Sequence, residues 1–165
     1  MTTSSFNKTG AAGFGVEIPF VSHLGFELEW FDGGESTIGY TPKPEHLNTF
    51  GVLHGGACMT LLDVCMALAT RSVQKDMGAV TIEMKTSFMR PSPGDGSRLT
   101  AKARIIHRTA TMAFTEATIH DAQGRACAHA TGTFKYVRRL PAEAKSDVGS
   151  HQPIVDAPVG IISTD

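Results

Sequence analysis

The stretch FGVLHGGACMTLLDVCMALATRS, residues 50–72, decides the fold of this chain. It is too long for a β-strand, and it is rich in Ala, Leu and Met, which are strong helix formers. Between His54 and Arg71 almost every side chain is apolar or small, so we expect a helix that is buried on nearly all sides. The one charged side chain between them is Asp63.

Strand-like patterns flank this helix. Residues 23–32 and 35–42 predict a β-hairpin around the turn Asp32-Gly33-Gly34. Four more strands are expected after the helix, at residues 79–90, 97–109, 112–122 and 125–139. The alternation of apolar and polar residues in several of them indicates an antiparallel sheet with one covered face. We therefore expect an α+β fold in which this sheet wraps around the single long helix.

Length and charge limit the organisation of the chain. The 165 residues suffice for one domain, which we expect at residues 15–140. Residues 1–14 are rich in Ser, Thr, Gly and Ala and predict a flexible arm, and residues 141–165 predict an extended tail. With 41% hydrophobic residues and a formal net charge of -1, the composition disfavours nucleic acid or a membrane surface as a partner.

Cysteine content and the absence of apolar runs indicate the compartment. The three cysteines are an odd number and form neither a disulfide framework nor a zinc motif. The N-terminal residues lack the basic start and apolar run of a secretion signal, and no run reaches the roughly 18 apolar residues of a spanning helix. We therefore expect a soluble, cytoplasmic protein without a metal.

Asp63 has two interpretations. An ionised carboxylate is costly to bury unless it is paired or hydrogen-bonded. Its neighbours one helical turn away are Met59, Thr60, Met66 and Ala67, and none is cationic. Asp63 is either a structural polar group that meets the sheet or a helix edge, or it is functional.

The dipeptide Gly55-Gly56 follows His54 at the start of the helix. Glycines there allow a ligand to approach the backbone, and the free N–H groups of a first turn suit a developing oxyanion. The alternative is an ordinary glycine-rich turn. On one regular helix, Gly55 and Asp63 would lie about 12 Å apart along the axis, whereas catalytic groups must lie within about 3–3.5 Å of the reacting atoms. They can share one carbonyl only if a two-fold axis brings Gly55 of one subunit opposite Asp63 of another.

A family resemblance adds to these patterns. Asn48, followed by GVLHGG (51–56), TLLD (60–63) and VTIEMKTSFMRPSPG (80–94), resembles the acyl-CoA thioesterases of the 4-hydroxybenzoyl-CoA thioesterase superfamily, in the branch of the phenylacetate-pathway thioesterase. The likeness runs from about residue 24 to residue 138. It implies the hotdog fold, in which an antiparallel sheet wraps around one long central helix.

The resemblance implies roles for five catalytic residues. Asp63 corresponds to the carboxylate that acts as general base on water or as nucleophile, and the sequence does not decide between the two. Gly55 corresponds to the backbone donor that polarises the thioester carbonyl from the opposing subunit. Asn48 would help to hold the carboxylate or the water, His54 would lie near the thioester oxygen, and Thr81 would position the water. Without the resemblance, Asn48 is equally a loop residue, His54 a capping or packing residue, and Thr81 an ordinary strand residue.

Further residues are candidates for substrate binding. Arg90 at the proline-rich turn, and His107 and Arg108 at a later strand end, are candidates for the phosphates of coenzyme A, although each charge can simply be solvated. Pro91, next to Arg90, is a further substrate-binding candidate. Gly56, like Gly55, would let a ligand approach the backbone at the start of the helix. The candidates for the acyl pocket between subunits are Met59, Met66 and Phe88. The alternative for the two methionines is that they are ordinary residues of the hydrophobic core.

The predicted function is hydrolysis of an acyl-CoA with an aryl or medium-chain acyl group, with no cofactor because coenzyme A is part of the substrate. The expected assembly is a homodimer that forms the active site and pairs into a homotetramer. Two alternatives stay open, a hotdog hydratase or dehydratase and a non-catalytic acyl-CoA binding protein. A hydratase of this fold would use a catalytic histidine with a nearby acid, whereas His54 precedes the helix and Asp63 lies within it.

Overall fold

The computed structural model describes residues 18–138. The arm expected at residues 1–14 and the tail expected at residues 141–165 lie outside the described residues. The elements in chain order are α1 (Pro19–Leu24), β1 (Glu27–Asp32), β2 (Glu35–Tyr40), the 3₁₀ turn η2 (Pro44–His46), α2 (Gly55–Ser72), β3 (Met77–Phe88), β4 (Leu99–Arg108), β5 (Met112–His120) and β6 (Ala126–Arg138).

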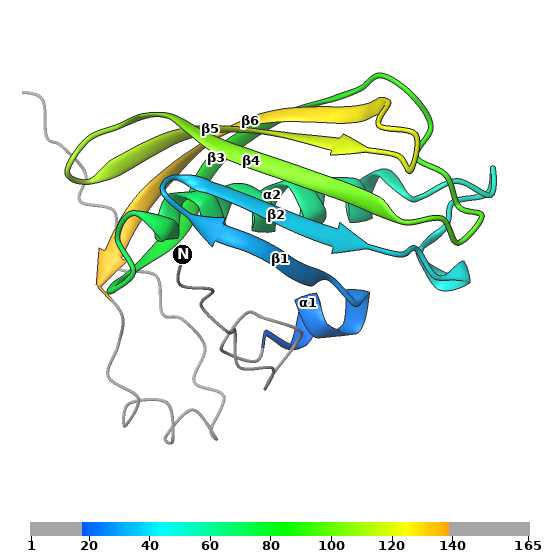
Figure 1. The fold of residues 1–165 in the computed structure, drawn as a ribbon, viewed down its shortest axis with the longest axis horizontal. Helices are drawn as coiled ribbons and strands as arrows, with labels where there is room; N and C mark the ends of the chain where they lie inside the picture. Colours follow the sequence, from blue (N-terminus) through cyan, green and yellow to red (C-terminus); the bar gives the residue numbers. More distant parts are fainter. Residues whose placement is uncertain (1–17, 139–165) are drawn as a thin grey trace, which may run out of the picture.

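The six strands form one antiparallel sheet in the order β1-β2-β4-β5-β6-β3. The sheet curves over α2, which runs along its concave side and contacts all six strands (Figure 1). This arrangement confirms the predicted α+β hotdog fold. In the described part of the chain, neither helix combines the length and apolarity needed to cross a membrane.

Small side chains on the concave face of the sheet allow α2 to lie close. Ala101, Ala117 and Ala130 are almost completely buried there. At Gly132 an added Cβ would lie 3.0 Å from Met66 Cε, so the missing side chain makes room for a helix methionine. The helix is therefore anchored by tight packing against the middle of the sheet.

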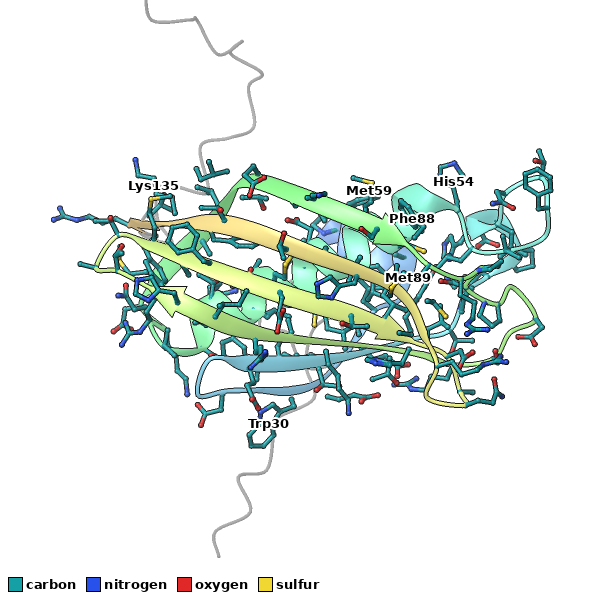
Figure 2. All side chains as sticks on the ribbon, turned by 90° about the horizontal axis from the view of Figure 1, so that it is seen from above. Trp30, His54, Met59, Phe88, Met89 and Lys135 are labelled. Atoms are coloured by element: carbon teal, nitrogen blue, oxygen red, sulfur yellow. The ribbon has the colours of Figure 1, made fainter. Side chains whose placement is uncertain are left out.

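The expectation that α2 is buried on nearly all sides is wrong for the single chain. The sheet covers one side of the helix, while Gly56 and Met59 on the other side are exposed, Met59 by 40%. Figure 2 shows Met59, Phe88 and His54 toward one end of the molecule and Lys135 at the other. An apolar helix with an open face indicates a surface that is covered in an assembly.

Two boundaries differ from the expected ones. The strand expected at residues 23–32 begins only at Glu27, because Pro19 starts a short helix and Gly25 ends it with a left-handed φ of 76°. The helix within residues 50–72 begins at Gly55. The preceding residues form a turn in which Gly51 has a φ of 71°.

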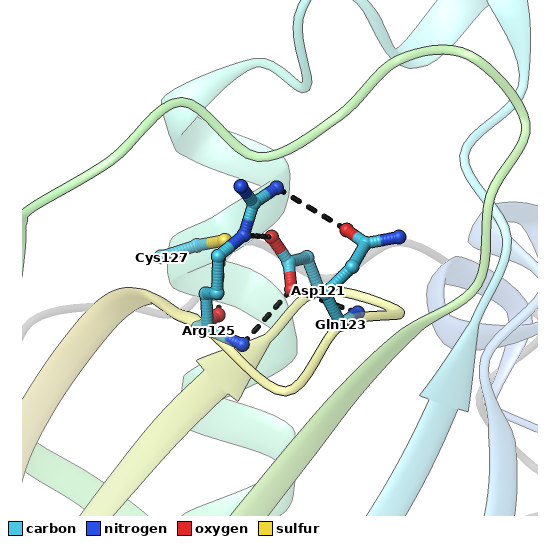
Figure 3. Close-up of polar contacts among 4 residues, drawn as sticks. All are labelled: Asp121, Gln123, Arg125 and Cys127. Atoms are coloured by element: carbon cyan, nitrogen blue, oxygen red, sulfur yellow. Dashed lines mark hydrogen bonds and ion pairs between the residues drawn. The ribbon is translucent and has the colours of Figure 1, made fainter.

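A buried carboxylate closes the turn between β5 and β6 (Figure 3). The side chain of Asp121 is 0% exposed, and its Oδ1 accepts hydrogen bonds from the backbone N–H groups of Gln123 at 3.0 Å and Arg125 at 2.9 Å. The Arg125 Nε donates to Asp121 Oδ2 at 2.7 Å. Three donors thus hold this carboxylate and fix the turn that the sequence predicts there.

The two loops near the start of α2 lock against each other. The Leu53 N–H donates to the Ser92 carbonyl at 3.1 Å, which ties the loop before α2 to the loop after β3. At Gly94 any side chain would collide with the Gly51 carbonyl oxygen. A glycine at position 94 is therefore needed for this close approach.

Strand β3 forms one edge of the sheet. Its far side has no partner strand within residues 18–138. Val80 and Ile82 on this strand are 44% and 54% exposed, although β-branched apolar residues are usually found in sheet interiors. An edge of this kind is a surface for pairing with another chain.

Candidate active site

Asp63 lies in the middle of α2 and is half-buried. Its Oδ1 accepts a hydrogen bond of 2.7 Å from the Thr81 hydroxyl on β3. Burial raises the pKa of Asp63 above its ordinary value, and the Thr81 hydrogen bond offsets part of that rise. Among the residues that the structure describes, no cation pairs with this carboxylate. The geometry leaves an accessible carboxylate with one partner.

The start of α2 is capped by its own histidine. His54 is the N-cap residue, and its Nδ1 accepts a hydrogen bond of 2.9 Å from the Gly56 N–H. This confirms the capping alternative for His54. Because Nδ1 is an acceptor, a neutral His54 carries its hydrogen on Nε2, which can donate to a further group. Capping and a contact with substrate therefore use different ring nitrogens.

The Gly55 N–H has no acceptor within residues 18–138. A Cβ built on Gly55 would lie 3.5 Å from the Phe88 ring, so this aromatic side chain of β3 lies beside the helix start. The Gly55 amide is thus a free donor at the positive end of α2. Such an amide can stabilise negative charge on a carbonyl oxygen.

Asn48 lies near this amide but also shapes its loop. The Asn48 Oδ1 accepts hydrogen bonds from the N–H groups of Phe50 at 2.9 Å and Val52 at 3.4 Å. This geometry agrees with the loop role that the sequence left open. The Asn48 side-chain amide has no acceptor within the described ranges and can still donate to a ligand.

Several predicted residues line one cavity of about 390 Å³ beside the helix start. The cavity brings together the predicted Asn48, Gly55, Phe88, Arg90 and Pro91. Residues 48–55 and 88–91 are far apart in the sequence, so the fold creates this proximity. The sequence analysis did not single out Ser92, another lining residue, because it looked like an ordinary turn residue.

Asp63 and Gly55 cannot act on one carbonyl from a single chain. Both lie on the same regular helix, which is continuous from Gly55 to Ser72. Eight residues of helix separate them by about 12 Å along the axis. The structure therefore separates two groups of candidate residues along α2, with Thr81 beside Asp63 in one group and Phe88 beside Gly55 in the other.

The candidates for the acyl pocket divide into two kinds. Met59 and Phe88 are 40% and 56% exposed and are available to a ligand or a second subunit. Met66 is 0% exposed and packs at Gly132, which favours the core role left open by the sequence.

His107 and Arg108 lie apart from the other candidates. They line a cavity of about 450 Å³ that also includes Gly34 and Val73. Val73 follows the last residue of α2, whereas Gly55 is its first. Any contact of His107 and Arg108 with a ligand at Gly55 would require a second subunit.

Known proteins resemble this chain in both sequence and structure. The family model described as "Thioesterase superfamily" matches residues 50–128. "Putative esterase SSO2140" of Saccharolobus solfataricus is 30% identical over 112 residues, which are 68% of this chain and 78% of that protein. Human "Acyl-coenzyme A thioesterase 13" is 29% identical over 94 residues, 53% of this chain and 66% of that protein.

A solved structure supports the same assignment. The structure of the PaaI protein from the phenylacetic acid degradation operon of E. coli is 25% identical, with a TM-score of 0.67. The match covers 72% of this chain and 83% of that one. Together with the hotdog topology and the Asn48, Gly55 and Asp63 pattern, these likenesses show that the chain belongs to the Thioesterase superfamily.

Proposed function

We propose that this protein hydrolyses an acyl-CoA thioester, with an aryl or medium-chain acyl group, to the free acid and coenzyme A. The observation that carries the proposal is the half-buried Asp63, which has one hydroxyl partner and lies on the same helix as the free Gly55 amide. Membership of the Thioesterase superfamily and the likeness to human acyl-coenzyme A thioesterase 13 support the substrate class.

The proposed chemistry begins at Asp63, which takes a proton from water or attacks the thioester carbon itself. In the general-base route, the water oxygen bonds to the carbonyl carbon and the carbonyl oxygen becomes negative. The Gly55 N–H stabilises that charge. The carbon–sulfur bond then breaks, the coenzyme A sulfur receives the proton from Asp63, and the acid is released.

The proposed site is shared by two subunits. A two-fold axis that places Gly55 opposite Asp63 of the partner subunit passes near Met59, which lies midway between them on α2. The same operation brings the exposed β3 edges, with Val80 and Ile82, toward each other. The open face of α2 and the open edge of β3 would thus be covered together.

Coenzyme A has a proposed place beside the helix start. The cavity that contains Asn48, Phe88 and Arg90 would hold its pantetheine arm, and Arg90 would meet a phosphate. His107 and Arg108 would contribute only from another subunit. The homotetramer and the cytoplasmic location stay predictions.

The hydratase alternative gains no support from the site. His54 uses Nδ1 to cap α2 and does not pair with an acid within residues 18–138. A screen of thiol release over short, branched, long and aryl acyl-CoAs, with an enoyl-CoA assayed for hydration, separates the two activities. Release of thiol from none of them would overturn the hydrolase proposal.

Subunit complementation tests the shared site. Gly55→Pro removes the proposed amide donor, yet proline suits the first position of a helix. His54 already has the extended backbone, φ -60° and ψ 137°, that a residue before proline needs. Gly55→Ala is the matched control, because it keeps the N–H and its Cβ meets Phe88 at an ordinary 3.5 Å.

We expect Gly55→Pro and Asp63→Asn each to reduce activity at least about 100-fold as homodimers, and Gly55→Ala to stay near wild type. Refolding the two inactive chains together at equal amounts should restore about a quarter of wild-type activity, because half of the dimers are mixed and each has one complete site. A mixture no more active than its parents would overturn the shared site.

A further inference from the structure

Phe50 is the most exposed large apolar side chain in the described part of the chain, at 87%. The loop before α2 forms a short hairpin that begins with the bridge between Leu47 and Leu53, and Phe50 lies at its tip. The ring lines neither of the cavities described above. Single exposed apolar side chains are common on protein surfaces, so the surroundings of Phe50 must decide its role.

The hairpin holds Phe50 in a fixed position. The Phe50 N–H donates to the Asn48 Oδ1 at 2.9 Å, and the Gly51 N–H donates to the Asn48 carbonyl at 3.0 Å. The close approach of Gly94 to the Gly51 carbonyl braces the tip from the loop after β3. An aromatic side chain on a preorganised loop loses little conformational freedom on binding, which is typical of the residues that dominate interfaces.

Apolar surface extends from the hairpin toward α2. Phe88 and Met89, at the start of the loop that braces the hairpin, are 56% and 57% exposed. Phe88 lies beside the start of α2, and Met59 follows on the open face of the helix (Figure 2). A run of exposed apolar side chains, unlike a single one, marks a surface that binds a partner. Phe50 is thus the outer end of the face that the proposed dimer would cover.

The proposed two-fold axis determines which part of the partner the hairpin meets. The axis passes near Met59, so residues before Met59 on one α2 face residues after Met59 on the other. The hairpin continues past the start of α2, away from the later turns of the helix (Figure 1). Since Gly55 lies opposite the partner's Asp63, the hairpin lies level with the partner residues that follow Asp63 on α2.

Small side chains leave room at that level. Ala67 lies one helical turn after Asp63, about 6 Å along the axis, and Ala79 lies two residues before Thr81 on β3, about 7 Å along the strand. Because Thr81 contacts Asp63 and the two elements run in opposite directions here, Ala67 and Ala79 lie at the same level. Both are half-buried and carry only a methyl group. Their level therefore offers a shallow apolar surface between α2 and β3.

We propose that Phe50 of each subunit docks on the other, between the partner's Ala67 and the partner's Ala79. The proposal rests on the proposed function, because the shared site sets the two-fold axis. The contact occurs twice in the dimer and lies one helical turn from the partner's Asp63. It would hold the hairpin that carries Asn48 against the helix that carries the catalytic carboxylate.

The first test measures the dissociation constant of the dimer by analytical ultracentrifugation. Phe50→Ala should raise it at least about 30-fold, because each dimer loses two copies of an aromatic contact. Trp30→Ala is the matched control. Trp30 is 52% exposed on β1, at the opposite edge of the sheet from β3, and its loss should leave the constant unchanged. A Phe50→Ala dimer as tight as wild type would overturn the proposal, and a raised KM in that dimer would assign Phe50 to the ligand instead.

The second test identifies the surface that receives Phe50. Phe50→Lys and Ala67→Glu should each weaken the homodimer. An equal mixture of the two folded variants should associate at least about tenfold more tightly than either alone, because a mixed dimer keeps one native contact and gains a Lys–Glu pair. A mixture that associates no more tightly than its components would overturn the proposed pairing.

Neither measurement needs a substrate, so the contact and the hydrolase function can fail separately. A weakened Phe50→Ala dimer, in a protein that releases no thiol from any acyl-CoA, would support the contact and overturn the hydrolase function. A Phe50→Ala variant that dimerises and hydrolyses acyl-CoA like wild type at every dilution would overturn the contact alone. A monomeric wild type would overturn both the contact and the shared site.

Discussion

Two aspartates of this protein, the buried Asp121 and the half-buried Asp63, differ in their hydrogen-bond partners. Asp121 accepts two backbone N–H groups and the Arg125 guanidinium in a closed turn (Figure 3). Asp63 has the Thr81 hydroxyl alone. Burial would raise the pKa of Asp121, but its donors lower it below the ordinary value, whereas the pKa of Asp63 is raised.

The difference separates a carboxylate whose hydrogen-bonding capacity is used by the fold from one that has capacity left for a ligand. The charge of Asp121 is fully used in holding a turn, so it has no capacity left for a substrate. Asp63 has unused lone pairs, a raised pKa and a place on the open face of α2, and these are the properties of a base or nucleophile. The number and kind of partners, more than burial, thus decide which aspartate can do chemistry.

The largest effect is expected from Asp63→Asn. The change removes the charge at nearly constant volume, so thiol release from the best acyl-CoA should fall at least about 100-fold while ligand binding is retained. Steady-state kinetics and calorimetry measure the two quantities. Asp121→Asn is the matched control and should leave kcat/KM of the folded protein unchanged. A fully active Asp63→Asn variant would remove the distinction between the two aspartates.

A smaller effect is expected from Thr81→Val, which deletes the one partner of Asp63. Loss of a hydrogen bond to a carboxylate should lower kcat/KM about tenfold. The hydroxyl stabilises the charged form, so its loss raises the pKa of Asp63 further and moves the acid limb of the pH–rate profile to higher pH. Thr81→Ser keeps the hydroxyl and should retain the wild-type profile. An unshifted profile in Thr81→Val would contradict the assigned contact.

The smallest effects are expected in stability, and they have opposite signs. The folded-state pKa of Asp63 is raised, so wild type loses stability relative to Asp63→Asn as the pH rises above the ordinary aspartate pKa of 3.8. The pKa of Asp121 is lowered, so its contribution is present above that value and is lost as the pH falls through its folded-state pKa. Melting temperatures of the two variants between pH 3 and pH 7 should differ from wild type by a few degrees in opposite directions. Melting-temperature differences of the same sign in the two variants would contradict the opposite directions of the two pKa changes.

Much of the fold could be predicted from particular residues. The apolar run after Gly55 predicted α2, and alternation in residues 97–139 predicted the later strands, because both patterns are long. The six-residue helix α1 was missed, since Leu24 and Phe26 also fit a strand pattern and only Pro19 and Gly25 signal the helix. Short elements carry too few residues for a periodic signal.

The candidate site was less predictable than the fold. The contact of Thr81 with Asp63 is between residues 18 apart on different elements, and without the family resemblance Thr81 looked like any strand residue. The apolar pattern of α2 did not reveal its open face, because an apolar helix looks the same whether a sheet or a second subunit covers it. Only the spacing of Gly55 and Asp63 pointed to a second subunit.

The uncovered edge of β3 has a consequence for handling the protein. A folded single chain would expose the unpaired backbone N–H and C=O groups of β3 next to the apolar side chains of Val80 and Ile82. No other part of residues 18–138 covers this edge. Under the proposed assembly, dilution would dissociate the dimer, so the shared site would be lost and the β3 edge would be exposed at the same time. Specific activity should fall, and precipitation should begin, over the same range of protein concentration.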